Sequence, residues 1–254
     1  SWSPNSNKLL VAVKSNGKDV MFIIDIDNGY KKIKLSLDDD VVGIFKPSWN
    51  PSNENLISFI GSNGFQTDIY IYNIQSNELI NLTDDIYTEH GVQWVENGKN
   101  LIFSSDRNSN LLDNSSKIND NWGYQYDIFK TVFKNMKISS LIRLTNTSWN
   151  EVNPIMVDDE TCIFISDRNG INNIYKMNVS NNFSEPISNS FTGITQITAA
   201  GTDIFFTGFE KMKFGIYKLD STTFLNPKSE IENALWLKNY KNYKYLNEDK
   251  KINY

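Results

Sequence analysis

The chain has 254 residues, of which 39% are hydrophobic and 13% aromatic, so it can build a sizeable core and is not a disordered segment. Its net charge of -5 argues against binding to nucleic acid, which requires a basic patch. Cys162 is the single cysteine, which excludes an internal disulfide and a cysteine-based zinc cluster. No run approaches the ~20 apolar residues that span a bilayer.

A repeated frame begins at an anchor residue and has a short apolar run seven residues later. At Trp94, for example, the turn Asn97-Gly98-Lys99 leads to the run Leu101-Ile102-Phe103. The anchors in chain order are Trp2, Trp49, Trp94, Ile155 and Ile197. They are 47, 45, 61 and 42 residues apart, which indicates an internal repeat with a period mostly in the forties.

Each unit of the repeat continues with a turn, a third run, another turn and a fourth run. The third runs are Asp19-Val20-Met21, Asp68-Ile69-Tyr70, Asp127-Ile128-Phe129, Asn173-Ile174-Tyr175 and Gly215-Ile216-Tyr217. The fourth run closes on pairs such as Leu82-Thr83. Four short β runs per period predict an all-β fold, a β-propeller of four-stranded blades, whose anchors and apolar runs pack between blades. A β-sandwich is the alternative, but it requires no period.

Five blades are visible, and we expect them to belong to a ring of six or seven. The chain opens inside a repeat at Ser1, so we expect a propeller over residues 1–224 whose N-terminal part is truncated. Residues 225–254 form a separate helical or linker tail. There Ser229 can cap a short helix that reaches about Tyr240, with Glu230 and Glu232 near its positive end.

The combined motifs resemble the TolB-like propeller repeats of bacteria. The residues that carry the likeness are Trp49-Asn50-Pro51, Ser166-Asp167-Arg168-Asn169-Gly170, Asp68-Ile69-Tyr70 and Leu82-Thr83. The resemblance covers about residues 1–224 and implies a periplasmic, non-catalytic scaffold of the cell envelope. It also implies a protein partner, such as a Pal-like envelope lipoprotein. Two departures are the lack of a recognisable small N-terminal α/β domain and the count of five repeats where six are usual.

The up-and-down path of a blade brings two sets of loops to one face. One is a long excursion, Arg107 to Tyr126, between the second and third runs of the third unit. The other set connects successive units. The candidate partner-binding residues in these loops are Trp122, Tyr124, Tyr126, Tyr87, His90 and Trp149. Loops on a rigid scaffold carry recognition, and Trp and Tyr are favoured anchors, so we expect this face to bind a protein or peptide. Alternatively, the excursion only folds over its own blade and the acidic loop residues are solvated.

The sequence offers little for catalysis. His90 is the only histidine, and no Gly-x-Ser-x-Gly elbow or glycine-rich phosphate loop is present. The two Ser-Asp-Arg motifs, at Asp106-Arg107 and Asp167-Arg168, suit a structural role, in which Asp accepts backbone N–H groups and Arg reaches a neighbouring carboxylate or carbonyl. We therefore expect no catalytic residue, no cofactor and no metal site.

Two further functions remain open. The chain can be the propeller domain of a prolyl-oligopeptidase-type peptidase, or of a larger envelope protein with further domains. A third possibility is a carbohydrate-binding propeller with Trp122 and Trp149 as sugar platforms.

Overall fold

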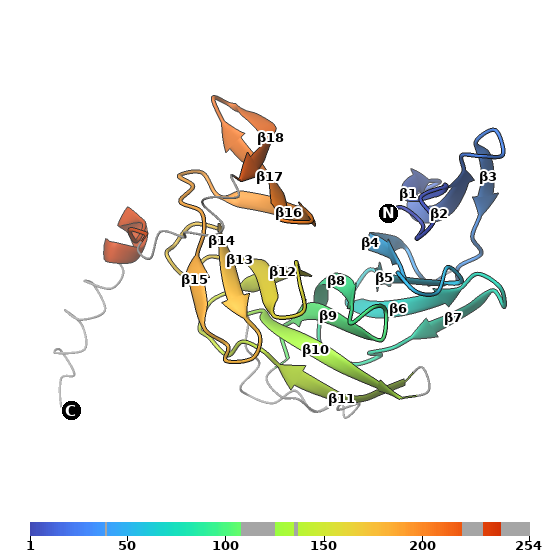
Figure 1. Cartoon of the computed structure of the whole chain (residues 1–254), viewed down its shortest axis with the longest axis horizontal. Coiled ribbons are helices and arrows are strands. Elements are labelled where there is room, and N and C mark those ends of the chain that lie inside the picture. The colour runs from blue at the N-terminus through green and yellow to red at the C-terminus, as the bar shows by residue number, and fades with distance from the viewer. Residues whose placement is uncertain (39, 108–124, 135–136, 220–230, 240–254) are drawn as a thin grey trace. The chain divides into compact units, whose positions relative to one another are not determined.

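A computed structural model describes residues 1–38, 40–107, 125–134, 137–219 and 231–239. These residues form five antiparallel sheets (Figure 1). They fall into two compact units, the first made of Ser1–Thr147 with Glu151–Pro154, the second of Ser148–Asn150 with Ile155–Tyr254. No helix in the described ranges is long and apolar enough to cross a membrane.

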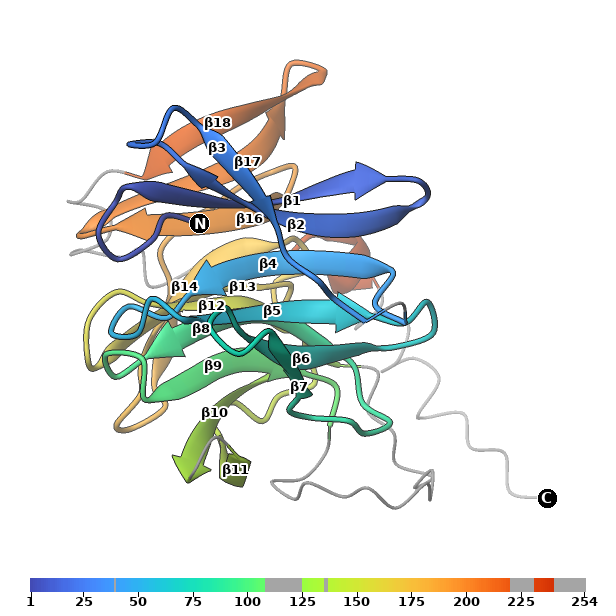
Figure 2. The ribbon, with the colours of Figure 1, turned by 90° about the vertical axis from the view of Figure 1, so that its right-hand side faces the viewer.

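The first unit holds three sheets, each with its strands in chain order. The first sheet consists of β1 (Lys8–Ser15), β2 (Lys18–Asp25) and β3 (Lys31–Lys34). The second consists of β4 (Gly43–Trp49), β5 (Leu56–Ser62), β6 (Thr67–Asn73) and β7 (Glu78–Asn81). The third consists of β8 (Glu89–Val95), β9 (Asn100–Ser105), β10 (Asp127–Lys134) and β11 (Lys137–Arg143). Figure 2 shows β4, β5 and β6 side by side.

The remaining two sheets repeat this order. The fourth consists of β12 (Glu151–Met156), β13 (Thr161–Ser166), β14 (Asn173–Asn178) and β15 (Ser184–Pro186). The fifth consists of β16 (Ile194–Ala200), β17 (Asp203–Glu210) and β18 (Lys213–Leu219). Consecutive antiparallel strands joined by short turns form the topology of a propeller blade, so the predicted fold class, an all-β propeller, is confirmed. Three of the sheets have four described strands and two have three.

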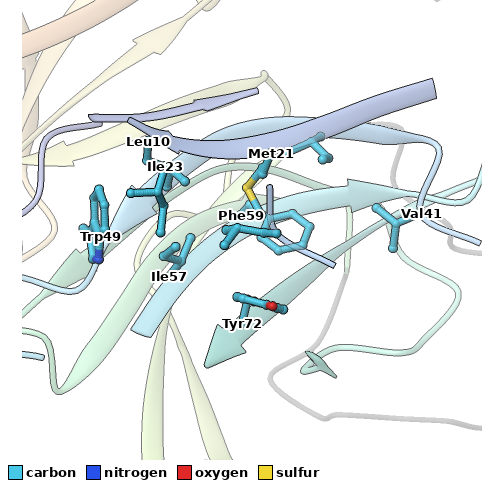
Figure 3. Packing of buried hydrophobic residues seen from close by; sticks show 10 residues of the cluster. Leu10, Met21, Ile23, Val41, Trp49, Ile57, Phe59 and Tyr72 are labelled. Atoms are coloured by element: carbon cyan, nitrogen blue, oxygen red, sulfur yellow. The ribbon is translucent and has the colours of Figure 1, made fainter. Parts of the chain in front are cut away.

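The second sheet is buried on both faces, as its apolar runs predicted. Ile57 and Phe59 of β5 pack with Met21 of the first sheet in one cluster (Figure 3). Their neighbour Ile60 packs in a second cluster with Trp94 of the third sheet. Because side chains alternate along a strand, one strand contributes to both clusters.

The anchor positions differ in burial. Trp49, Trp94 and Ile197 are buried, Ile155 is half-buried, and the Trp49 indole N–H donates to Glu54 O at 2.8 Å. Trp2 pairs with Leu9 in an isolated bridge but is 56% exposed. The expectation that every anchor lies in the core is therefore wrong for Trp2.

The first strands of the second, third and fourth sheets, which we call the inner strands, share a distortion that the sequence pattern did not predict. Lys46, Gly91 and Asn153 have φ angles of 51°, 59° and 55°, and the pairing register of β4 and β8 shifts beside the first two. A Cβ on Gly91 would lie 2.8 Å from Asn153 Cα, so glycine is required there by both conformation and space.

The tail helix is shorter than predicted. It covers residues 235–239, while residues 231–234 are not helical, and Ser229 lies outside the described residues. The indole N–H of Trp236 donates to Gly170 O at 2.9 Å. Ala234 N also donates to Asn169 O at 2.7 Å, so the backbone of this segment is held by a loop of the fourth sheet before the helix begins.

Replacing Phe59 by alanine should lower the free energy of unfolding by ~3–5 kcal/mol, because the ring is fully buried between two sheets. Urea denaturation measures the change. Phe65→Ala is the matched control, since Phe65 is 98% exposed and its loss should cost within ~0.5 kcal/mol. Equal effects of the two substitutions would mean that this cluster does not stabilise the unit.

Candidate functional site

In the third and in the fourth sheet, the loop that connects to the sheet lies against the start of the turn after the second strand. We call the loop end of a sheet the end where the chain passes from one sheet to the next; in the second to fifth sheets the second strand also turns to the third at this end. There Thr88 N donates to Asp106 Oδ1 at 2.8 Å, and Asn150 N donates to Asp167 Oδ1 at 2.9 Å. These contacts join the connecting loop to the turn after the second strand. They also give both Asp residues of the Ser-Asp-Arg motifs a structural role.

The loop end of the third sheet encloses a fully buried guanidinium. Arg107 Nη2 lies 2.5 Å from Glu89 Oε1 and 3.0 Å from Asp85 Oδ2, and Arg107 Nε donates to Ser105 Oγ at 3.0 Å. The side chains of Arg107, Glu89 and Asp85 are all 0% exposed. Arg107 Cζ lies 5.2 Å from the centre of the Tyr87 ring, so an aromatic face contributes to stabilising the cation.

One hydroxyl links this cluster to the preceding sheet. Thr83 Oγ1 lies 3.1 Å from both Asp68 Oδ1 and Glu89 Oε2, and it accepts the N–H of Ile69 at 3.1 Å. A hydroxyl has one hydrogen and can donate to only one of the two carboxyl groups. A proton on Glu89 resolves the conflict, because Glu89 can then donate to Thr83 while Thr83 donates to Asp68.

Burial also favours the protonated form of Glu89. Loss of hydration raises the pKa of Glu89 to about 8, although Arg107 opposes the shift. Burial also raises the pKa of Asp85. A carboxyl group with such a shift is a candidate catalytic acid. Glu89 has no solvent-exposed surface, however, and its partners lie within the protein, so the shift reflects a structural network.

The repeated Asp-Ile-aromatic and Leu-Thr motifs meet in the same way elsewhere. Thr145 Oγ1 donates to Asp127 Oδ1 at 2.9 Å, and Ser188 Oγ donates to Asn173 Oδ1 at 2.9 Å. The Asp-Ile-aromatic and Leu-Thr motifs are thus hydrogen-bonded supports beneath the loop end. They hold the connecting loops in position and do not themselves face solvent.

The fourth sheet contains a second guanidinium in the corresponding place. Arg168 Nε donates to Ser166 Oγ at 3.1 Å, and Arg168 Nη1 donates to Ser184 Oγ at 2.8 Å. Its Cζ lies 4.3 Å from the Tyr175 ring centre and 5.6 Å from that of Phe164. With the same Ser-x-Arg spacing, both arginines donate to the serine and lie against aromatic rings.

The predicted partner-binding residues have different surroundings. His90 is exposed and packs edge-on against Tyr126, with ring centres 4.9 Å apart; loss of hydration lowers the pKa of His90, and Asp106 opposes this. Tyr87 is only 9% exposed because it covers Arg107, which leaves it little surface for a partner. Trp149 is half-buried and belongs to the second unit. Trp122 and Tyr124 lie outside the described residues.

Other exposed side chains at the loop ends were not predicted. Phe65 follows β5, Phe191 precedes β16 and Met212 follows β17. They are 98%, 91% and 90% exposed, the highest values among the exposed large apolar side chains of the described residues. Each lies at the loop end of its own sheet. The signal in the sequence was an apolar residue inside a polar turn, as in Asn63-Gly64-Phe65.

No protein-family model matches the chain. A stretch of 84 residues, 33% of the chain, is 34% identical to the Tol-Pal system protein TolB of Ruthia magnifica subsp. Calyptogena magnifica. The chain carries TolB-like propeller repeats. The match spans 19% of that TolB, about a fifth of its length.

Solved structures with low sequence identity share the fold of these TolB-like repeats. The putative TolB of Agrobacterium tumefaciens matches with a TM-score of 0.66 at 17% identity, over 87% of this chain and 75% of that chain. A puromycin hydrolase matches with a TM-score of 0.63 at 10% identity, over 88% of this chain and 35% of that chain. At these identities the likeness establishes the propeller fold alone.

The Glu89→Gln variant should unfold with a different pH dependence from the unchanged protein. The native pKa of Glu89, about 8, lies above its unfolded value, near 4.5. The native state therefore holds a proton that the unfolded state releases between these pH values, and stability falls as pH rises, by up to ~1.4 kcal/mol per pH unit. Because glutamine is neutral throughout, the variant lacks this contribution to the fall. Urea titrations between about pH 5 and pH 8 measure the difference.

Glu96→Gln serves as the control for this measurement. The side-chain hydrogen bond from Lys130 lowers the pKa of Glu96, so its charge is constant over this range. The Glu96→Gln effect should therefore be independent of pH. Stability curves of Glu89→Gln and the unchanged protein that run parallel from pH 5 to pH 8 would show that Glu89 is ionised in the native state.

Proposed function

We propose that this chain is a non-catalytic, TolB-like propeller of the bacterial cell envelope that binds a protein or peptide partner through the loop ends of its sheets. The observation that carries the proposal is the exposure of Phe65, Phe191 and Met212 at those ends. Aromatic side chains and methionine are enriched in protein interfaces, and loops positioned by a rigid scaffold often carry binding residues.

The buried networks support this function by holding the loops rigid. Arg107 and its partners fix the loops around Asp85 and Asp106, so a partner meets loops that need little further ordering. Such preorganisation lowers the entropy cost of binding. His90, which is exposed, and Tyr126, which is half-buried, lie beside this network and remain proposed contacts, as do Trp122, Tyr124 and Trp149.

The likeness to TolB supports the finer parts of the proposal. We infer a periplasmic location and a Pal-like envelope lipoprotein as the partner, because the matched protein is a component of the Tol-Pal system. Among the described residues, no three His, Cys, Asp or Glu side chains are grouped to hold a metal ion.

The double variant Phe65→Ala/Phe191→Ala should weaken binding of the soluble domain of a Pal-type lipoprotein at least tenfold. The reason is that buried aromatic anchors each contribute roughly 1–2 kcal/mol to an interface. Isothermal titration calorimetry with the purified domain measures the affinity, and thermal melting checks that the variant is folded.

The control is a second pair of exposed aromatic side chains at the opposite ends of their sheets. Tyr30 is 67% exposed before β3, and Phe183 is 64% exposed before β15. Tyr30→Ala/Phe183→Ala should leave the affinity within about twofold. Equal losses in both pairs would contradict a loop-end site, and no binding by the unchanged chain would contradict the choice of a Pal-type partner.

The match to a hydrolase favours a second candidate function. The chain covers 35% of the puromycin hydrolase chain, as expected if a propeller is one domain of a modular enzyme. In that case the loop ends would dock a catalytic domain. The complete gene separates the two functions, because a Gly-x-Ser-x-Gly elbow downstream supports the enzyme, and its absence leaves the scaffold.

A further inference from the structure

Four of the five sheets contain the same stacked pair of aromatic rings across their second and third strands. The pairs are Phe59–Tyr70, Phe103–Phe129, Phe164–Tyr175 and Phe206–Tyr217, with ring centres 5.4 to 6.0 Å apart. Each pair is directly opposed in its strand register, so the four positions are equivalent. What covers the pair differs from sheet to sheet.

In the third and fourth sheets an arginine of the same chain covers the pair. Arg107 Cζ lies 5.8 and 5.9 Å from the Phe103 and Phe129 ring centres, and Arg168 covers Phe164 and Tyr175 as described above. Each arginine is four residues after the phenylalanine of its pair. The serine that accepts its Nε–H is two residues after that phenylalanine.

In the second sheet the ring of Tyr70 occupies the space that the serine side chain fills in the third and fourth sheets. Gly61 stands in the serine position, and a Cβ on it would lie 2.6 Å from the Tyr70 ring. The ring therefore fills the volume that serine occupies in the other sheets. No arginine is needed to cover the pair there.

In the fifth sheet no arginine of the described residues covers the pair. Gly208 stands in the serine position, but a Cβ there would clear the Tyr217 and Phe206 rings at 3.5 and 3.6 Å. A cavity of about 510 Å³ lies over the pair. Its walls include Phe191, Phe206, Phe209 and Tyr217, and Ser190, Thr192 and Glu210 supply polar groups.

The charge pattern of this cavity is the reverse of the filled sites. Glu210 occupies the sequence position of Arg107 and Arg168, four residues after the phenylalanine of the pair. Ile194 occupies the position of Glu89, because Ile194 pairs with Gly208 as Glu89 pairs with Ser105. Glu210 accepts the Tyr217 hydroxyl at 3.2 Å. Its contact with Lys211, 3.6 Å long between two exposed side chains, is too solvated to neutralise it effectively.

We propose that the cavity of the fifth sheet binds an arginine side chain presented by a partner peptide. The aromatic pair is the surface that holds a guanidinium in two other sheets of this chain, and Glu210 supplies the carboxylate. A planar guanidinium stacks on aromatic rings and pairs with a carboxylate through two hydrogen bonds, which a lysine ammonium does not do. The volume lies within the range of ligand pockets, roughly 300–1,000 Å³. The inference rests on the proposed function and specifies the chemistry of its partner.

The test compares three capped tripeptides, Gly-Arg-Gly, Gly-Lys-Gly and Gly-citrulline-Gly, bound to the full chain and followed by amide NMR shifts of Gly193 and Gly208. The citrulline peptide has nearly the shape of the arginine peptide but no charge. We expect the arginine peptide to bind at least fivefold more tightly than either of the others. Glu210→Gln should remove that preference, while Glu160→Gln, in an exposed turn at the opposite end of the fourth sheet, should not.

A second variant fills the cavity from within. Gly208→Ser/Glu210→Arg rebuilds the Ser-x-Arg spacing of the third and fourth sheets, and it should abolish binding of the arginine peptide. Binding that survives this change, equal binding of the citrulline or lysine peptide, or no shift at tens of millimolar peptide would overturn the proposal.

These outcomes are separable from failure of the proposed function. Loss of Pal-type binding in Phe65→Ala/Phe191→Ala together with no arginine binding would overturn only the arginine site. Arginine binding by a chain that binds no Pal-type domain would leave the cavity assigned and contradict that partner.

Discussion

The strands of the second sheet carry apolar side chains on both faces, so the sheet is stable only when another sheet covers each face. Ile57 and Phe59 face one neighbour and Ile60 faces the other, which removes the polar-apolar alternation that a half-exposed strand would show. This requirement fixes the spacing and tilt of adjacent sheets within a unit. It leaves the loop ends as the part of each sheet where residues can change without disturbing the core.

At the loop end of the third sheet, polar groups replace apolar packing, and the buried guanidinium of Arg107 lies against the carboxyl groups of Glu89 and Asp85. A buried guanidinium without a carboxylate, or a buried carboxylate without a donor, costs several kcal/mol. The chain itself follows this rule. Sheets with an inner-strand glutamate, Glu89 or Glu151, also have the serine and the arginine, and sheets with isoleucine at that position, Ile44 or Ile194, have glycine and no arginine. The glutamate, the serine and the arginine therefore occur together in this chain.

The repeat made most of the fold predictable, because each apolar run and turn recurs in register and every copy supports the others. The sequence also predicted that connecting loops and second-to-third-strand turns meet. It did not predict the bulges at Lys46 and Gly91, since these depend on how the inner strands pack and leave no apolar signature. The partnership of Arg107 with Glu89 was missed for a related reason. The two residues are 18 positions apart, and only the strand register shows that they meet. The alternative interpretation, in which the acidic loop residues are solvated, is wrong for Asp85 and Glu89, where a buried cation and hydroxyl groups offset the desolvation.

The same register argument explains why one loop end differs from the others in its capacity to bind. In the third and fourth sheets the aromatic pair has lost its water to an arginine of the chain, so no further ligand can gain from covering it. In the fifth sheet the rings of Phe206 and Tyr217 line an open cavity, and Glu210 lies at its rim. A cation entering there would remove water from the rings and pair with a carboxylate already in position, and the strands that hold these groups need no rearrangement. The cost of ordering is small in such a site, so even a short peptide segment can gain affinity from a single side chain.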